Sequence, residues 1–217
     1  VTGGQPSRIL GHIHANGQVF LVNPNGVFFG PGAEVDVAGL VATTLEIDDD
    51  AFMAGDYAFA RPEGQGEAGQ VVNEGVIRAR ESGYVILAGD YVENRGVIEA
   101  RLGDIALAAG DRVHLDVEGD GLISFAVDGE AMTELAGVEN TGQLYADGGR
   151  VLMTAEVADD LVTTAVNSEG LVQARGIQEQ DGAIVLAGGD IHHGGRLDAS
   201  GPRGGRIRVE SDRDIDL

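Results

Sequence analysis

The sequence of 217 residues carries 36 acidic residues against 14 arginines and no lysine, for a formal net charge of −22. A chain this acidic repels phosphate backbones and anionic lipids, which argues against nucleic-acid binding and membrane insertion. The absence of cysteine excludes disulfides, zinc–thiolate sites and thiol nucleophiles. The 35 glycines, mixed with Val, Ile, Leu and Ala, indicate many tight turns between short strands.

The first third of the chain has a less regular pattern than the rest. We divide the chain into residues 1–70 and residues 71–217, which carry a repeat. Within the first part, residues 48–55 predict one short helical turn, because Asp48 suits its start and Gly55 suits its end. The chain opens at Val1 without a methionine and in mid-pattern, so we expect a segment of a longer polypeptide.

One phrase recurs from residue 73 onward: asparagine, one or two residues, glycine, and then a short apolar strand. The first two copies begin 21 residues apart. We expect each asparagine to stack at a corner and to hydrogen-bond its copy in the next turn of chain, and each glycine to supply a positive φ. These structural turns are Asn73 with Gly75, Asn94 with Gly96, Asn140 with Gly142, and Asn167 with Gly170.

A second phrase follows each first one, a glycine and then alternating apolar residues, as in residues 83–87, 103–107 and 149–153. A third strand closes the unit, as at residues 90–93 and 111–117. Three strands and three turns make one coil, and stacked coils would lie about 4.8 Å apart. The sequence therefore predicts an all-β protein, a right-handed parallel β-helix (three-sided solenoid) of roughly ten coils.

The longer spacers predict departures from the coil. Residues 119–137 and 174–181 are expected to be loops, and residues 157–165 fit either a helical turn or a strand. Alternative folds are weaker. A β-sandwich would show hairpin signals without a coil-length period, and a leucine-rich repeat would show its Leu/Asn ladder together with helices.

Residues 8–30 contain the phrase Asn23-Pro24-Asn25-Gly26 and resemble the haemagglutination-activity domain, the secretion module of filamentous-haemagglutinin-type exoproteins. Residues 1–7 and 32–44 are similar to the same domain, and the later repeats are similar to the β-helix that follows it. The resemblance implies two-partner secretion. In such systems an outer-membrane transporter recognises the module in the periplasm, so the resemblance leads us to expect that the exoprotein crosses the membrane unfolded and folds on the cell surface.

The signature motif of that family falls on Asn23, Pro24, Asn25 and Gly26, which the resemblance makes candidate transporter-recognition residues. From the residues alone, the same phrase predicts a tight turn. Pro24 fixes φ, Asn25 and Gly26 accept a positive φ, and Asn23 can cap its own backbone. The two roles are compatible, and both stay open at the level of sequence.

Other polar groups give weaker signals. His192 and His193 are adjacent on a predicted strand and point to opposite faces, whereas His12 and His14 share a face but have no third ligand nearby. We interpret all four as solvated surface residues. Acidic residues gather at residues 46–56 and 116–121, where their oxygens suit Ca²⁺, but neither stretch matches a calcium loop. We predict solvated loops and no metal or cofactor, with Ca²⁺ as the alternative.

Catalysis has little support in the sequence. Parallel β-helices include polysaccharide lyases and hydrolases, but this chain has 4 tyrosines and no tryptophan to form a sugar platform, and it lacks a Gly-x-Ser-x-Gly motif and a phosphate loop. We therefore predict that the chain is not an enzyme.

We expect a segment of a secreted bacterial surface exoprotein that acts in adhesion after passage through the periplasm and outer membrane. Its expected partners are the outer-membrane two-partner-secretion transporter, and receptors or glycans of host or neighbouring cells. The main alternative is a structural solenoid module that self-associates end to end into filaments. A β-helical carbohydrate-active enzyme is the remaining alternative.

Overall fold

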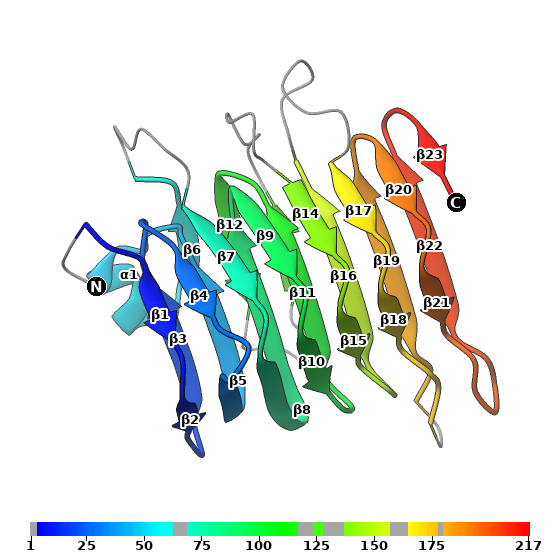
Figure 1. Cartoon of the computed structure of the whole chain (residues 1–217), viewed down its shortest axis with the longest axis horizontal. Helices are drawn as coiled ribbons and strands as arrows, with labels where there is room; N and C mark the ends of the chain where they lie inside the picture. Colours follow the sequence, from blue (N-terminus) through cyan, green and yellow to red (C-terminus); the bar gives the residue numbers. More distant parts are fainter. Residues whose placement is uncertain (1–3, 63–68, 117–123, 128–136, 157–164, 178–179) are drawn as a thin grey trace.

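In the computed structural model, the described residues are 4–62, 69–116, 124–127, 137–156, 165–177 and 180–217. They form a right-handed parallel β-helix whose coils stack along one axis, with the two chain ends at opposite ends of the stack (Figure 1). Across these ranges, no helix has both the length and the apolar character needed to span a bilayer. The predicted fold class is confirmed.

Each coil contributes one strand to each of three sides, and neighbouring strands on a side pair in parallel. The first side consists of β1 (Ser7–Ile9), β4 (Val27–Phe29), β7 (Gln70–Asn73), β9 (Tyr91–Asn94), β14 (Gly137–Asn140), β17 (Val166–Ser168), β20 (Ile191–His193) and β23 (Ile215–Asp216). The second side consists of β2 (His12–His14), the first halves of β5 (Glu34–Thr43) and β8 (Val76–Gly89), β10 (Val97–Ala100), β15 (Gln143–Tyr145), β18 (Leu171–Gln173) and β21 (Arg196–Asp198). The third side consists of β3 (Gln18–Val22), the second halves of β5 and β8, β11 (Asp104–Ala109), β16 (Arg150–Ala155), β19 (Ala183–Gly188) and β22 (Arg206–Ser211).

The described strands make seven complete coils, and β23 begins another. The prediction of roughly ten coils was wrong, because it divided the whole length by the 21-residue period. Several coils contain insertions, so that equivalent positions in neighbouring coils are separated by more than 21 residues of sequence. The ladder positions Asn94 and Asn140, for example, lie 46 residues apart in sequence and one coil apart in space.

Aliphatic side chains fill the interior in columns that run along the axis. One column passes through Ile77, Ile98, Leu144 and Val172, which are paired from strand to strand and fully buried. Strand alternation produces this arrangement, because every second side chain of a strand points inward and parallel in-register pairing places like positions above one another. A single apolar cluster therefore extends from Val27 to Ile191.

The recurring glycines serve a different purpose from the one predicted. At the corner where the asparagine–glycine phrase recurs, none of Gly75, Gly96, Gly142 and Gly170 has a positive φ. A Cβ atom at Gly96, Gly142 or Gly170 would instead collide with the carbonyl oxygen of the corner glycine one coil earlier. The glycines are needed because successive coils approach closely at this corner. The sequence therefore identified the correct glycine positions, but the prediction that they have a positive φ was wrong.

The asparagine ladder runs through three successive coils. Asn73 donates from Nδ2 to Oδ1 of Asn94 at 2.8 Å, and Asn94 donates in the same way to Asn140 at 2.9 Å. All three are fully buried, and the amide groups of Asn73 and Asn94 each donate to the next asparagine in place of water. In the next coil Ser168, and not the predicted Asn167, is paired with Asn140. The strand puts adjacent residues on opposite faces, so Asn167 points away from the ladder.

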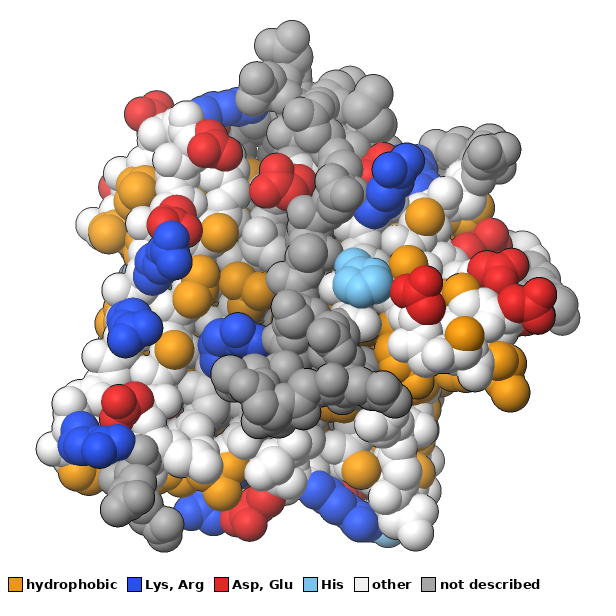
Figure 2. Space-filling model, turned by 180° about the vertical axis from the view of Figure 1, so that it is seen from behind, with side chains coloured by type: hydrophobic (Ala, Val, Ile, Leu, Met, Phe, Trp, Pro, Cys, Tyr) orange, Lys and Arg blue, Asp and Glu red, His pale blue; other side chains and the backbone are white. Residues whose placement is uncertain are grey.

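A second, antiparallel layer covers part of the third side. It contains α1 (Asp49–Ala54), β6 (Tyr57–Ala60), β12 (Arg112–Asp116) and β13 (Ser124–Val127), in the sheet order β13-β12-β6. This side layer encloses its own apolar cluster, in which Phe59, Val113 and Leu115 pack on outward side chains of the third side such as Ile86 and Ala106. Figure 2 views the molecule from this direction, with acidic side chains gathered at the right-hand end.

Two sequence predictions fail in this layer. The strand at residues 111–117 was expected to close a coil, but β12 leaves the β-helix and pairs antiparallel with β6 and β13. It can do so because Val113 and Leu115 pack on a second apolar surface, formed by outward-facing side chains of the β-helix. The spacer at residues 119–137, expected to be a loop, contains β13, while residues 117–123 and 128–136 lie outside the described residues.

The other local predictions have separate outcomes. The helical turn is confirmed as α1, with Asp48 capping the amides of Asp50 and Ala51 and Gly55 ending the helix at φ 80°. Residues 174–181 form no regular strand in their described part, apart from a bridge between Ile177 and Gln180. The ambiguous stretch at residues 157–165 falls outside the described residues except for Ala165.

Candidate recognition turn and polar sites

The Asn23–Gly26 motif forms the tight turn between β3 and β4, where the chain passes from the first coil to the second. The amide of Gly26 donates to the carbonyl of Asn23 at 2.9 Å, which closes the turn. Gly26 has φ 119°, a conformation that favours glycine. Asn25, which the sequence analysis also allowed a positive φ, does not have one. The turn role of the motif is thus carried by Asn23 and Gly26.

The side chain of Asn23 is fully buried and holds two segments together. Its Nδ2 donates to the carbonyl of Gln5 at 3.1 Å and to Oγ of Ser7 at 2.9 Å. Its Oδ1 accepts from the backbone amide of Asn25 at 3.0 Å and from the side-chain amide of Asn25 at 3.1 Å. The asparagine therefore caps its own turn, as expected, and also fastens the start of the first coil.

The backbone around the turn extends this attachment to the next coil. The amide of Asn23 donates to Thr43 at 3.0 Å, and the amide of Ser7 donates to the carbonyl of Gly26 at 2.9 Å. A Cβ atom at Gly26 would lie 3.1 Å from the carbonyl of Gln70, so the third coil also packs closely here. The turn is consequently a junction of the first three coils.

Accessibility differs among the four motif residues. Asn23 and Gly26 are buried, Pro24 is half-buried and Asn25 is exposed. Pro24 lines an open pocket of about 610 Å³ together with Glu46, Asp48, Asp49 and Arg61. In the folded protein, a partner therefore reaches only the middle of the motif.

A buried ion pair lies close to that pocket. Arg61 Nη1 is 3.1 Å from Asp90 Oδ2, and both side chains are largely shielded from water. Burial raises the pKa of Asp90, the positive charge of Arg61 opposes this shift, and Asp111 adds to it. Because Arg61 follows β6 and Asp90 precedes β9, the pair connects the side layer to the β-helix.

The histidines that were predicted to be solvated fall into two groups. His12 and His14 are exposed on one face of β2, opposite Glu34 at 3.3 Å and Asp36 at 3.5 Å. His193 points inward and is buried, so the prediction of a surface residue was wrong for it. It occupies the corner position of the asparagine ladder one coil beyond Ser168.

His192 lies on the outward face between two carboxylates from neighbouring coils. Its Nε2 is 2.8 Å from Glu169 Oε1, and its Nδ1 is 3.0 Å from Asp216 Oδ2. The hydrogen bond with Glu169, followed by that with Asp216, raises the pKa of His192. Sequence reasoning missed this cluster because its members lie more than 20 residues apart and meet only through the coil register.

The acidic stretches do not gather into a metal cage in the described part of the chain. Over those residues there is no group of three or more His, Cys, Asp or Glu placed to hold a metal ion. At residues 46–56, Asp48 is engaged as the cap of α1, while residues 117–121 of the second stretch lie outside the described ranges. The two readings, solvated loops and Ca²⁺ binding, stay predictions.

The fold of the whole chain matches that of a solved protein domain. The chain superimposes over its full length on the crystal structure of the HMW1 secretion domain from Haemophilus influenzae, with a TM-score of 0.74, 24% identity and 68% of that structure covered. At this level of identity the match establishes the shared fold. It places the chain in the class of β-helical domains to which that secretion domain belongs.

Two sequence comparisons define the relationship further. The family model of the TPS secretion domain matches residues 1–208. Two heme/hemopexin-binding proteins of Haemophilus influenzae are 33% identical over 206 and 216 residues, which cover 93% and 88% of this chain. The chain spans 22% of the length of each of these relatives. It belongs to the TPS (two-partner secretion) secretion domain family, whose members are exported across the outer membrane to the cell surface or beyond.

Proposed function

We propose that the Asn23–Gly26 turn is the element that the outer-membrane transporter recognises, and that it is recognised before the domain folds. Membership in the secretion-domain family supports a transporter partner in general. The burial of Asn23 is the observation that carries the finer proposal. Both polar atoms of its side chain are engaged within the protein, so a partner that reads this amide must do so while the chain is unfolded.

Folding and recognition then compete for the same side chain. On the periplasmic side, the transporter binds the unfolded motif. On the outer side, Asn23 turns to Gln5 and Ser7, and Gly26 packs against the third coil. If the transporter binds Asn23 only in the unfolded chain, folding removes this binding group. Folding therefore favours release from the transporter, because binding and folding are thermodynamically linked. The domain thereby combines an export signal with the first step of its own folding.

A binding experiment tests this proposal. The chain is unfolded in urea, diluted into the periplasmic part of a cognate transporter, and captured before it folds, in parallel with chain that was folded beforehand. We expect binding of the unfolded chain only. Equal binding of the folded chain would contradict the proposal, because the folded form hides Asn23.

Beyond export, we propose that the exoprotein containing this domain acts in adhesion, as the sequence resemblance implies, through receptors or glycans of host or neighbouring cells. The long β-helical shaft supports this role by offering a rigid, extended surface. Binding of the exoprotein to epithelial or bacterial cells, compared with a strain that lacks its transporter, tests it. Equal adherence of the two strains would contradict it, and end-to-end filaments in electron micrographs would favour the solenoid-module alternative.

A second candidate comes from the relatives. Two proteins related to this domain are described as heme/hemopexin-binding, so we propose heme or hemopexin as an alternative cargo of the exoprotein. Titration of the exoprotein with heme, followed by its Soret absorbance, distinguishes this candidate from adhesion. We further propose that the domain is not catalytic, since the matched family is a secretion domain. Turnover of a polysaccharide panel by the purified chain would contradict this.

A further inference from the structure

The outward face of the second side carries a polar hollow whose lining includes no residue of the Asn23–Gly26 motif. It has a volume of about 280 Å³ and is lined by Glu99, Arg101, Tyr145, Asp147 and Gln173. These residues come from three successive coils, and the strands that contribute Glu99, Tyr145 and Gln173 are paired in register. The three side chains therefore form one row, spaced by the distance between neighbouring strands.

Tyr145 lies in the middle of this row, between Glu99 and Gln173. Its hydroxyl donates to Gln143 Oε1 at 2.7 Å, two residues earlier on the same face of β15. This bond fixes the position of the phenol hydroxyl, and the side chain as a whole is half-buried. The part of the Tyr145 ring that remains open to the hollow offers an aromatic surface, which attracts flat, partly apolar ligand surfaces.

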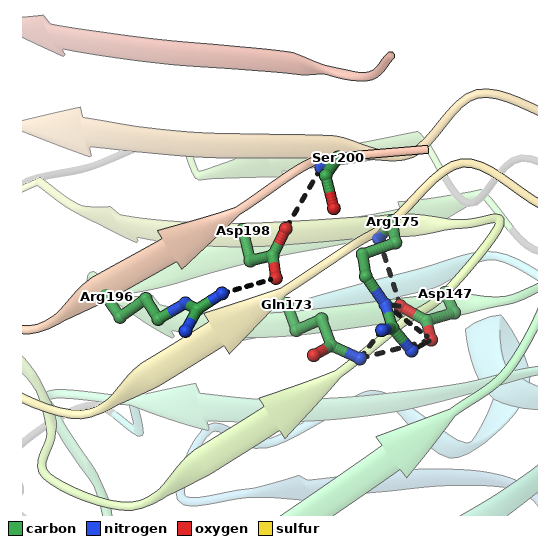
Figure 3. Close-up of polar contacts among 6 residues, drawn as sticks. All are labelled: Asp147, Gln173, Arg175, Arg196, Asp198 and Ser200. Atoms are coloured by element: carbon green, nitrogen blue, oxygen red, sulfur yellow. Dashed lines mark hydrogen bonds and ion pairs between the residues drawn. The ribbon is translucent and has the colours of Figure 1, made fainter. Parts of the chain in front are cut away.

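A fixed polar network forms one wall. Gln173 Nε2 lies 3.1 Å from both oxygens of Asp147, and Arg175 donates from its guanidinium to the same carboxylate, at 2.7 Å from Nη2 (Figure 3). Burial raises the pKa of Asp147, but the hydrogen bonds from Arg175 and Gln173 outweigh it and leave the pKa lowered. With Nε2 committed to Asp147, the amide of Gln173 is oriented, and its Oε1 is the atom left to accept from a ligand.

The opposite wall is charged and less constrained. Glu99 lies 3.6 Å from Arg78, and Arg101 lies 2.6 Å from Glu81, with each side chain about half exposed. The carboxylate of Glu99 offers acceptors and the guanidinium of Arg101 offers donors to a ligand in the hollow. An oriented amide, a carboxylate and a guanidinium around an aromatic face are a set that recognises a ring bearing several hydroxyl groups.

We propose that this hollow binds a single neutral pyranose, with the sugar stacked on Tyr145 and its hydroxyls bonded to Glu99 and Gln173. The volume lies at the small end of ligand sites, which suits one sugar ring. A net charge of −22 disfavours sialylated and sulfated glycans, because the field of the protein repels them. The inference is independent of the transporter proposal and gives the adhesion proposal one specific ligand class.

Saturation-transfer NMR on the purified chain tests the site directly. The ligands are the methyl glycosides of glucose, galactose, mannose and N-acetylglucosamine at millimolar concentration, with sialic acid as the charged comparison. We expect transfer to at least one neutral glycoside and none to sialic acid. Tyr145→Ala should lower the affinity about tenfold, while Tyr145→Phe, which keeps the ring, should retain most of it.

Arg196→Ala serves as the matched control, because Arg196 is exposed on the same side but lies outside the hollow. It should leave binding unchanged. Circular dichroism confirms that each variant folds. The proposal is overturned if none of the four neutral glycosides receives saturation, or if Tyr145→Ala binds as well as the unaltered chain. Either result leaves the transporter proposal unaffected, since that rests on the motif between β3 and β4.

Discussion

The β-helical shaft and the side layer are stabilised by the same kind of apolar packing but are encoded differently. In the shaft, each strand pairs with its copy one coil away, as Ile77 pairs with Ile98. In the side layer, β6 pairs with β12 across an intervening part of the shaft, with Tyr57 opposite Leu115. The shaft therefore follows from a local period, whereas the side layer depends on one long-range pairing. A sequence repeat can therefore specify the β-helix without specifying the layer that covers it.

The apolar clusters of the two regions are also shielded from solvent in different ways. Inward residues of the shaft are enclosed by all three sides, so each coil protects its neighbours. The cluster under the side layer is enclosed on one face by the third side and on the other by β6 and β12. Solenoids are stabilised through interfaces between neighbouring repeats, so damage in the shaft should spread along the axis. Damage in the side layer should stay local.

The largest effect is expected from a charge placed inside the shaft. Val85 is fully buried on the third side, and Val85→Asp would leave an unpaired carboxylate there, at a cost of several kcal/mol. We expect several coils to unfold, measured as loss of the strand signal in circular dichroism and of the urea-unfolding transition. Val97→Asp, on a half-exposed outward position, is the control and should change the free energy of unfolding by at most about 1 kcal/mol. Unchanged melting of Val85→Asp would mean that the inward column is misassigned.

Truncation of the side-layer core should give the next largest effect. Phe59 is 2% exposed, and Phe59→Ala should cost about 3 kcal/mol through lost contacts and a cavity. Hydrogen exchange should accelerate in β6 and β12 while β10 and β15 keep their protection. Equal acceleration of exchange in the shaft strands would show that the two regions unfold as one unit, which would contradict the expectation that damage in the side layer stays local.

The end of the asparagine ladder offers a smaller, stabilising change. Asn140 Nδ2 and Ser168 Oγ are buried and have no hydrogen-bond partner among the described residues. Ser168→Asn supplies the amide that the other coils have, and should raise the free energy of unfolding by about 1 kcal/mol. Ser168→Ala, which adds no partner, should be close to neutral. If Ser168→Asn is less stable than Ser168→Ala in urea titrations, the ladder does not continue into this coil.

The smallest effect is expected at His192, on the surface of the last coils. Because its pKa in the folded state is raised by Glu169 and Asp216, its contribution to stability is fully present below about pH 6.5 and is lost as the pH rises through the folded value. Burial lowers the pKa of His193, which acts in the opposite direction. The stability difference between the unaltered chain and His192→Gln should therefore be compared at each pH. It should be larger at acidic than at alkaline pH, and a difference that grows with pH would have the wrong sign.

Sequence reasoning reached the shaft because its determinants are repeated. The glycine and asparagine positions recur with the coil, so a period in the sequence becomes a column in space. Sequence reasoning failed where a shift of one residue decides which of two polar side chains points into the β-helix. Asn167 and Ser168 are both polar and adjacent, and only the pairing of Ser168 with Asn140 shows which one points inward.

The candidate sites were less accessible to prediction. The motif at residues 23–26 was visible as a turn, but the donors from Asn23 reach Gln5 and Ser7, which no local pattern connects to it. The hollow at Tyr145 joins residues from three coils that are separated by insertions of different length. Val113 and Leu115 fit an inward strand as well as the side layer, so their alternation alone does not choose between them.

Secretion by cells that carry the partner transporter tests the central claim most directly, with Asn23→Ala compared with Asn94→Ala. Both substitutions remove a fully buried amide from the folded protein, but only Asn23 belongs to the motif. We predict that Asn23→Ala accumulates in the periplasm while Asn94→Ala reaches the medium, even though both are less stable when folded. If the two variants are secreted to the same extent, or retained to the same extent, Asn23 has no role in recognition beyond that of any buried asparagine in the shaft.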